Sequence, residues 1–181
     1  MADGRFNPLI LLPPIIFFGL AGIFYFGLTR DDPNALPSQF IGEPAPTLTV
    51  TELYPDVKVP TDADIRAPGV KLVNFWASWC GPCRAEHPTL ERMSKDGITI
   101  IGINYKDRPE DAKKFLEDLG NPFAMIGVDS SGRTGIEWGV YGVPETFVID
   151  GDGKVVLRFP GPIVGNVFQK QIAPAIAAAS K

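Results

Sequence analysis

Two cysteines, Cys80 and Cys83, are the only thiol residues of this 181-residue chain, and Gly81 and Pro82 separate them. A pair at this spacing can pass between a dithiol and a disulfide, and so exchange electrons with other disulfides. The β-favouring run at 72–76 predicts a buried strand, and Pro82 suits the first turn of a helix because that position needs no backbone N–H. We therefore expect Cys80 at a helix N-terminus, where backbone N–H groups and the helix dipole stabilise a thiolate. The pattern predicts a catalyst of thiol:disulfide exchange.

Three other uses of the cysteine pair are less well supported by the sequence. A purely structural disulfide at this spacing would close a very small loop and restrict the unfolded chain little. A zinc site needs four ligands, and besides the two cysteines the chain has a single histidine, His87. Peroxide-reducing enzymes place a threonine three residues before their cysteine, whereas this chain has Ala77 there. We expect no metal and no cofactor.

On the helix expected after Cys80, an acidic residue shares a face with the second cysteine. Cys83, Glu86, Leu90 and Met93 recur at intervals of three and four residues, so the apolar members should turn Glu86 toward the core. Burial would raise the pKa of this carboxyl, which could then exchange a proton with Cys83. The alternative is a solvated glutamate at the helix edge. His87 is expected at the surface, and Pro88 is expected to bend the helix.

A second loop also bears on the cysteine pair. Pro144 directly precedes an expected strand, and the bond before a proline can be cis at modest cost. At this distance from the cysteines, the loop is expected to face them and to offer backbone groups to an extended peptide. An ordinary trans proline at the start of a strand is the alternative.

The rest of the chain supplies the elements that must position these residues. Residues 31–70 are rich in proline and predict a linker followed by short extended segments. Strands are expected at 71–76, 98–104, 123–128, 146–149 and 155–159, with helices at 82–93, 107–119, 131–138 and 167–179. Residues 150–153 predict a hairpin turn between the last two strands. This order predicts an α/β fold with a mixed sheet.

An uncharged run of twenty-one residues, 8–28, precedes the linker and is long enough to span a membrane. A cleavable signal is the alternative, but it would have a shorter apolar core and a small-residue cleavage site. Arg5 and Arg30 flank the run, so the charge bias does not decide its orientation. We expect an anchor at 1–30, a linker at 31–42 and a folded domain at 43–181. The net charge of −4, without a basic face, argues against a nucleic-acid partner.

Several motifs resemble those of known proteins. The thioredoxin superfamily is matched by Phe75-Trp76-Ala77-x-Trp79-Cys80-Gly81-Pro82-Cys83, by Pro88 and by Gly139-Val140-x-Gly142-x-Pro144. More narrowly, Asn104-Tyr105-Lys106-Asp107 and Pro144-Glu145-Thr146-Phe147 resemble the membrane-anchored, periplasmic CcmG/DsbE family of cytochrome c maturation. The resemblance implies a thioredoxin-like fold with a mixed central sheet, a central αβ insertion and an N-terminal transmembrane helix.

The resemblance also implies roles for individual residues. Thioredoxin carries a buried aspartate where this chain has Asn74, which strengthens the case for Glu86 as the proton carrier. Glu145 is implied as a second acidic group near the cysteines. A peptide groove lined by Trp79, Tyr141, Val143 and Pro144 is implied as well.

The function implied is reduction of the Cys-x-x-Cys-His disulfide of an apocytochrome, directly or through a partner thiol protein. Cys80 would attack, Cys83 would resolve the mixed disulfide, and a membrane thiol-reductant transporter would reduce the pair again. The protein would lie in the bacterial inner membrane as a single-pass protein, with its catalytic domain in the periplasm. Two alternatives stay open, namely a broader periplasmic reductant of copper-site or other thiol proteins and a non-enzymatic binding module.

Overall fold

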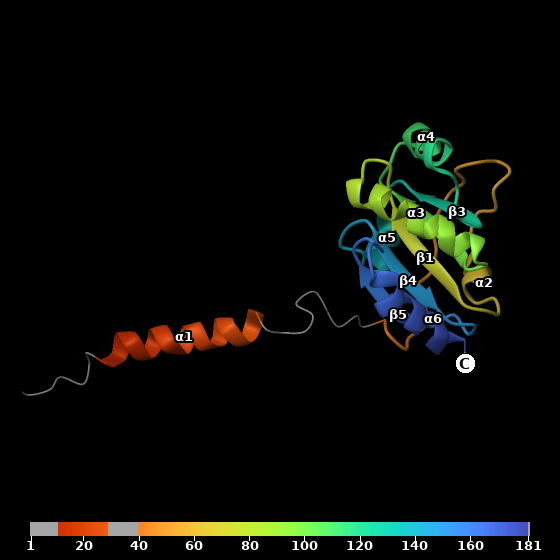
Figure 1. Cartoon of the computed structure of the whole chain (residues 1–181). Coiled ribbons are helices and arrows are strands. Elements are labelled where there is room, and N and C mark those ends of the chain that lie inside the picture. The colour runs from red at the N-terminus through yellow and green to blue at the C-terminus, as the bar shows by residue number, and fades with distance from the viewer. Residues whose placement is uncertain (1–10, 29–39, 181) are drawn as a thin grey trace, which may run out of the picture. The chain divides into compact units, whose positions relative to one another are not determined.

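The computed structural model describes residues 11–28 and 40–180, which fall into two parts, the helix α1 and a body that contains the remaining elements (Figure 1). The helices are α1 (Leu12–Leu28), α2 (Asp62–Ile65), α3 (Gly81–Lys95), α4 (Pro109–Leu119), α5 (Arg133–Glu137), the π-helix η2 (Phe168–Ile172) and α6 (Ala173–Ala179). The strands are β1 (Lys71–Trp76), β2 (Thr99–Tyr105), β3 (Met125–Asp129), β4 (Glu145–Ile149) and β5 (Val155–Pro160).

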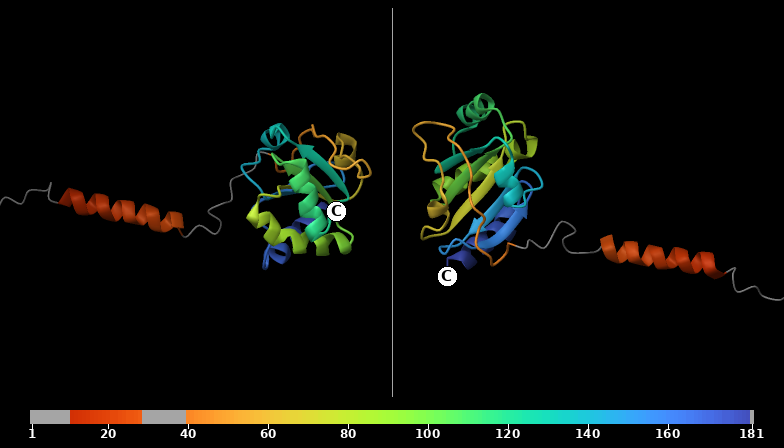
Figure 2. Two further views of the ribbon diagram at one scale, coloured as in Figure 1. Left: turned by 90° about the horizontal axis from the view of Figure 1, so that it is seen from above. Right: turned by 180° about the vertical axis from the view of Figure 1, so that it is seen from behind.

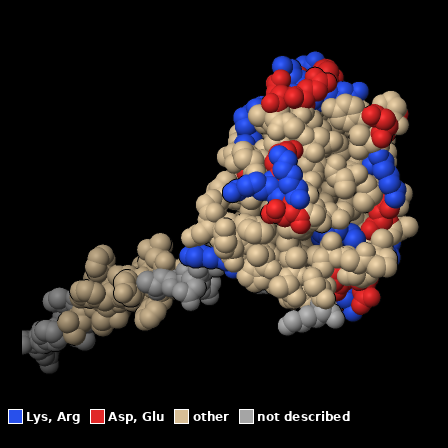
Figure 3. Space-filling model, turned by 45° about the vertical axis from the view of Figure 1, so that its right-hand side comes forward, with Lys and Arg blue, Asp and Glu red and all other residues tan. Residues whose placement is uncertain are grey.

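Helix α1 is 17 residues long and has no charged residue and no buried side chain. Its described surface in the space-filling view is accordingly free of acidic and basic groups (Figure 3). Among the helices of the described residues, none has both the length and the apolar character that crossing a membrane requires. The anchor at 1–30 stays a prediction, and residues 1–10, 29–30 and most of the expected linker at 31–42 lie outside the described residues.

The body is built on one five-stranded sheet with the order β3-β2-β1-β4-β5 (Figures 1 and 2). β1 runs parallel to β2, and β2 runs parallel to β3, whereas β4 is antiparallel to both β1 and β5. The mixed sheet is therefore confirmed, and so is the hairpin between β4 and β5. β1 is the central strand, and all its side chains are buried. The cysteine pair follows β1 in the chain, so it lies beyond the carboxyl end of the central strand.

Two hydrophobic cores lie on the two faces of the sheet. On one face, alternate strand residues such as Leu72 and Ile100 pack against α3, α4, η2 and α6. On the other face, the neighbouring residues, among them Phe75 and Phe147, pack against Ile65 of α2 and Trp138 just after α5. This alternation follows from the two-residue period of a strand, and both faces are covered as a buried, partly parallel sheet requires.

The helix–strand pair α4–β3 follows β2 and adds a parallel strand at the sheet edge. The central αβ insertion that the resemblance implies stays a prediction. Ala112, Phe115 and Leu116 form the buried side of α4. Gly120 ends the helix at a φ of 93°, a backbone conformation that glycine adopts without strain.

Two local features differ from the sequence expectation. The short helix α2 lies in the proline-rich region, where Thr61 and Asp64 form a reciprocal capping box at its start. The carboxyl-terminal segment is not one regular helix, because the π-helical turn η2 precedes α6. Pro174 lies in the first turn of α6, and since it has no N–H to donate, regular α-helical bonding cannot continue across it.

Candidate active site

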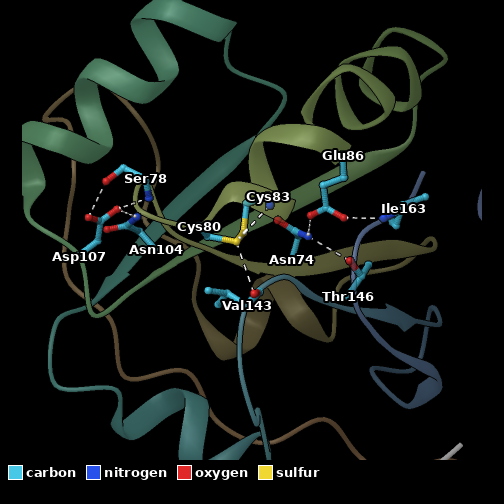
Figure 4. Close-up of a disulfide and its surroundings, with 10 residues drawn as sticks. All are labelled: Asn74, Ser78, Cys80, Cys83, Glu86, Asn104, Asp107, Val143, Thr146 and Ile163. Carbon is cyan, nitrogen blue, oxygen red and sulfur yellow. Dashed lines mark hydrogen bonds between the residues drawn. A yellow bond between two sulfur atoms is a disulfide. The ribbon is translucent and has the colours of Figure 1, made fainter. Parts of the chain in front are cut away.

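Cys80 and Cys83 form a disulfide at the start of α3, with their Cα atoms 5.3 Å apart (Figure 4). Cys80 is the N-cap residue, and its Sγ lies 3.0 Å from the backbone nitrogen of Cys83. Both cysteines are buried, at 4% and 2% exposure. When the disulfide is reduced, the same N–H group and the helix dipole can stabilise a thiolate on Cys80.

Glu86 lies one helical turn beyond Cys83 and is completely buried. Its Oε1 accepts a hydrogen bond of 3.0 Å from Nδ2 of Asn74, and its Oε2 accepts one of 2.8 Å from the backbone N–H of Ile163 (Figure 4). Burial raises the pKa of this carboxyl to about 7, although the two hydrogen bonds oppose the rise. The expected inward orientation of Glu86 is confirmed, and the solvated alternative is wrong.

Asn74 lies on β1 and connects Glu86 to the neighbouring strand. Besides donating to Glu86, its Nδ2 donates a hydrogen bond of 3.0 Å to Oγ1 of Thr146 on β4. The Oδ1 atom is buried and has no hydrogen-bond partner within the part of the chain that the structure describes. An amide does not titrate, so Glu86 is the group at this place that can take up and release a proton.

The Pro144 loop faces the disulfide. The Val143–Pro144 peptide bond is cis, and the carbonyl oxygen of Val143 lies 3.4 Å from Sγ of Cys80 (Figure 4). Trp79 and Tyr141 are exposed at 61% and 72%, which is unusual for large aromatic side chains. The structure thus places the expected groove residues on two loops, 77–80 and 140–144, that meet at the disulfide.

Glu145 is buried at the start of β4 and forms an ion pair with Arg158 of β5. Burial raises the pKa of Glu145, while the ion pair with Arg158 opposes that rise. Arg158 also donates to the carbonyl of Gly139 and places its guanidinium carbon 4.4 Å from the centroid of the Tyr141 ring. The sequence did not point to Arg158, and only the β4–β5 register, which pairs it with buried Phe147, could have indicated its inward position.

Sequence reasoning assigned no role to three polar residues on the other side of the disulfide. Asp107 accepts hydrogen bonds from the backbone and the hydroxyl of Ser78 and from the amide of Asn104 (Figure 4). Asn104 and Asp107 stand in one of the motifs that carry the family resemblance, which was the signal available in the sequence. These contacts join the turn after β2 to the loop that carries Trp79 and Cys80.

His87 is buried, so its expected surface position is wrong. Its ring packs edge-to-face on Phe115 of α4, and its Nε2 lies 2.9 Å from the carbonyl oxygen of Gly120. The sequence pattern of α3 alone did not show that α4 would cover this flank. Pro88 lies within α3, which continues to Lys95. Within residues 11–28 and 40–180, no group of three His, Cys, Asp or Glu side chains is arranged to hold a metal ion.

Known proteins are similar to this chain in sequence and in fold. The Redoxin family model matches residues 40–172. The thiol:disulfide interchange protein HelX of Rhodobacter capsulatus is 45% identical over 171 residues, covering 94% of this chain and 97% of the relative. The thiol:disulfide interchange protein DsbE homolog of Paracoccus denitrificans is 47% identical over 172 residues, covering 95% of each.

A crystal structure of a secreted Mycobacterium tuberculosis disulfide oxidoreductase homologous to E. coli DsbE aligns with a TM-score of 0.58. It covers 73% of this chain and 96% of that protein, and at 20% identity it shows the thioredoxin-like fold alone. The two sequence relatives carry the assignment further, because both match nearly end to end. With its Cys80–Cys83 disulfide at a helix N-terminus, the chain belongs to the DsbE/HelX family of thiol:disulfide interchange proteins.

Proposed function

We propose that this protein reduces the Cys-x-x-Cys-His disulfide of apocytochrome c, directly or through a partner thiol protein, during cytochrome c maturation. The observation that carries the proposal is the position of the two motifs that resemble the cytochrome c maturation family. Asp107 of the first motif holds the loop before Cys80, and Pro144 of the second follows the carbonyl that lies beside the Cys80 sulfur. The motifs most particular to that family therefore surround the reacting disulfide.

The reaction begins with the reduced pair. The Cys80 thiolate attacks one sulfur of the substrate disulfide, forming a mixed disulfide, and the other substrate sulfur leaves as a thiolate that takes up a proton. Cys83 then loses its proton and attacks the Cys80 sulfur, which releases the second substrate thiolate. Two electrons pass to the substrate, which becomes a dithiol, and the Cys80–Cys83 disulfide forms. The structure corresponds to this final oxidised state.

Glu86 supports the second step. It lies on the same helix face as Cys83, and its pKa of about 7 lets it exist in both protonation states near neutral pH. As a carboxylate it can accept the Cys83 proton when the mixed disulfide is resolved, and as an acid it can return the proton when the pair is reduced again. Asn74 holds the carboxyl by a hydrogen bond without competing for the proton.

The surface beside the disulfide binds the substrate as an extended peptide. Exposed Trp79 and Tyr141 provide apolar surface on the two loops that meet at Cys80, and Val143 presents its backbone there. Aromatic side chains of this kind bury large areas with few rotatable bonds, which favours their use in binding.

The protein works at a membrane in this function. The uncharged run at 8–28 anchors the protein in the bacterial inner membrane as a single span, with the catalytic domain in the periplasm. A membrane thiol-reductant transporter then reduces the Cys80–Cys83 disulfide after each turnover. Anchoring raises the effective concentration of the domain near membrane partners.

A trapping experiment tests the substrate. In a Cys83→Ala variant the mixed disulfide on Cys80 cannot be resolved, so covalent partners accumulate and are identified by mass spectrometry. The Cys80→Ala/Cys83→Ala variant is the matched control and should trap nothing. Apocytochrome c or a thiol protein of its maturation is expected, whereas copper-site proteins alone would support the broader reductant instead. If Cys80→Ala left cytochrome maturation intact in cells, the protein would be a binding module.

A further inference from the structure

The carboxylate of Asp107 is surrounded by four hydrogen-bond donors, two on each oxygen. Oδ2 accepts from the backbone N–H of Ser78 at 2.6 Å and from Nδ2 of Asn104 at 2.9 Å. Oδ1 accepts from the hydroxyl of Ser78 at 2.8 Å and from the backbone N–H of Arg108 at 2.9 Å. Hydrogen bonds to an ionised acceptor are about twice as strong as neutral ones. The side chain is thus tied to two strand ends at once (Figure 4).

A second contact joins the same two segments. Nε1 of Trp79 donates a hydrogen bond of 3.1 Å to the carbonyl oxygen of Lys106. Lys106 has a φ of 46°, which makes it the sole non-glycine residue with a positive φ within residues 11–28 and 40–180. A bulky side chain rarely adopts this conformation, so the surrounding contacts must hold the turn in place.

The topology explains why these contacts matter for the cysteines. β1 and β2 are parallel neighbours, and Trp76 at the end of β1 pairs with Asn104 near the end of β2. Only residues 77–80 connect β1 to α3, and the backbone N–H of Cys80 bonds the carbonyl of Ala77 within this stretch. Holding Ser78 and Trp79 against the turn after β2 therefore leaves Cys80 little freedom.

We propose that Asp107 is a positioning residue for thiol:disulfide exchange. Acting through Ser78, its carboxylate fixes the loop that presents the Trp79 ring and places the Cys80 sulfur at the helix N-terminus. Asp107 accepts its hydrogen bonds from Ser78, Asn104 and Arg108, so within residues 11–28 and 40–180 it reaches the cysteine pair through the 77–80 loop and not by bonding a sulfur. The inference rests on the thiol:disulfide interchange of the family and not on the identity of the proposed substrate.

The test replaces Asp107 with asparagine, which is nearly the same size. Because each carboxylate oxygen has two donors, either orientation of the new amide turns its NH₂ group toward a backbone N–H. The second-order rate constant for the reaction of the reduced full-length protein with 5,5′-dithiobis(2-nitrobenzoate) is measured at a temperature where circular dichroism shows the variant fully folded. We expect a decrease of about tenfold, the effect of losing one hydrogen bond to a charged acceptor.

Asp111→Asn is the matched control. Asp111 lies four residues further along, in the first turn of α4, where it is exposed and pairs with Arg108. The substitution therefore removes the same charge without touching Ser78. Its rate should stay within twofold of the wild type. A normal rate for Asp107→Asn, or an equal decrease for Asp111→Asn, would show that the contacts serve stability or bulk charge and would overturn the inference.

A double-mutant cycle tests whether Asp107 acts through Ser78. Ser78→Ala removes the hydroxyl donor and should lower the rate severalfold, whereas Ser78→Thr keeps a hydroxyl and should restore it. In an Asp107→Ala background, Ser78→Ala should have little further effect, because the carboxylate that the Ser78 hydroxyl contacts is already gone. Independent, additive effects would contradict the proposed route.

A peptide with an oxidised Cys-x-x-Cys-His sequence is assayed in parallel as a second substrate. If the proposed substrate is wrong, the wild type itself fails to reduce this peptide, and that result is distinct from a failure of the inference about Asp107.

Discussion

The buried Glu86 carboxyl should make the free energy of unfolding depend on pH, and the size of this effect follows from its pKa. Its pKa is raised from 4.5 to about 7, so the folded protein holds this proton over a range in which the unfolded chain has released it. The folded state therefore binds more protons, and the free energy of unfolding falls as the pH rises from 4.5 to 7. At about 1.4 kcal/mol for each unit of pKa, the whole loss is about 3 kcal/mol.

Glu86→Gln removes this dependence because glutamine has no proton to lose. The amide supplies one acceptor where the carboxyl has two, and losing one hydrogen bond costs about 1 kcal/mol. At pH 4.5 the variant should be less stable than the wild type by about that amount. Above pH 7.5 it should be more stable by about 2 kcal/mol, since the wild type then buries a charge.

The assay is urea unfolding of the oxidised protein between pH 4.5 and 8.5, with the cysteines held in the disulfide so that no thiol titrates. The quantity of interest is the difference between the unfolding free energies of variant and wild type. Glu91→Gln is the matched control, because Glu91 lies on the same helix but is partly exposed and paired with Lys95. For this variant the difference in unfolding free energy should not increase with pH as it does for Glu86→Gln. A Glu86→Gln difference that is constant over this range would refute the reasoning, and the proton-transfer role of Glu86 with it.

Three further predictions follow from other contacts. Arg158→Met leaves the Glu145 carboxylate buried without its partner and should cost about 3–5 kcal/mol, while adding Glu145→Gln should recover much of the loss in guanidinium unfolding at pH 7. Gly102→Ala places a Cβ 2.6 Å from the ring of Phe123 and should lower the free energy of unfolding by about 1–3 kcal/mol, measured in the same way. A loss below about 0.5 kcal/mol, as for a surface substitution, would show that the ring shifts freely. In the reduced protein, alkylation of Cys80 should reach its plateau rate at a lower pH than free cysteine does, and a matching profile would remove the helix N-terminus from the mechanism.

Much of the site was predictable because it depends on residues close together in the chain. Cys80, Pro82 and Cys83 fix the start of α3 through local backbone preferences, and the three- and four-residue spacing to Leu90 and Met93 places Glu86 on the buried face. These inferences need only the geometry of one strand and one helix. The Pro144 loop was predicted in the same way, from a proline before an expected strand at a suitable distance from the cysteine pair.

Other parts of the site depend on which elements become neighbours. His87 was expected at the surface because the α3 pattern alone does not show that α4 covers it. Arg158 lies on a strand where alternate positions face different environments, and only the hairpin register pairs it with Phe147 and brings it to Glu145. The role of Asp107 required the parallel pairing of β1 with β2.

The sequence by itself determined the chemistry, since a cysteine pair at a helix start, preceded by a buried strand, already specifies thiol exchange through short-range physics. It also determined the order of strands and helices, because periodicity and turn residues are local signals. Only the tertiary structure decided which charges are neutralised, which distant groups hold the Glu86 carboxyl and which turn holds the reactive loop. Those properties arise from burial and from contacts between residues up to 77 positions apart, such as Glu86 and Ile163, and no local pattern encodes them.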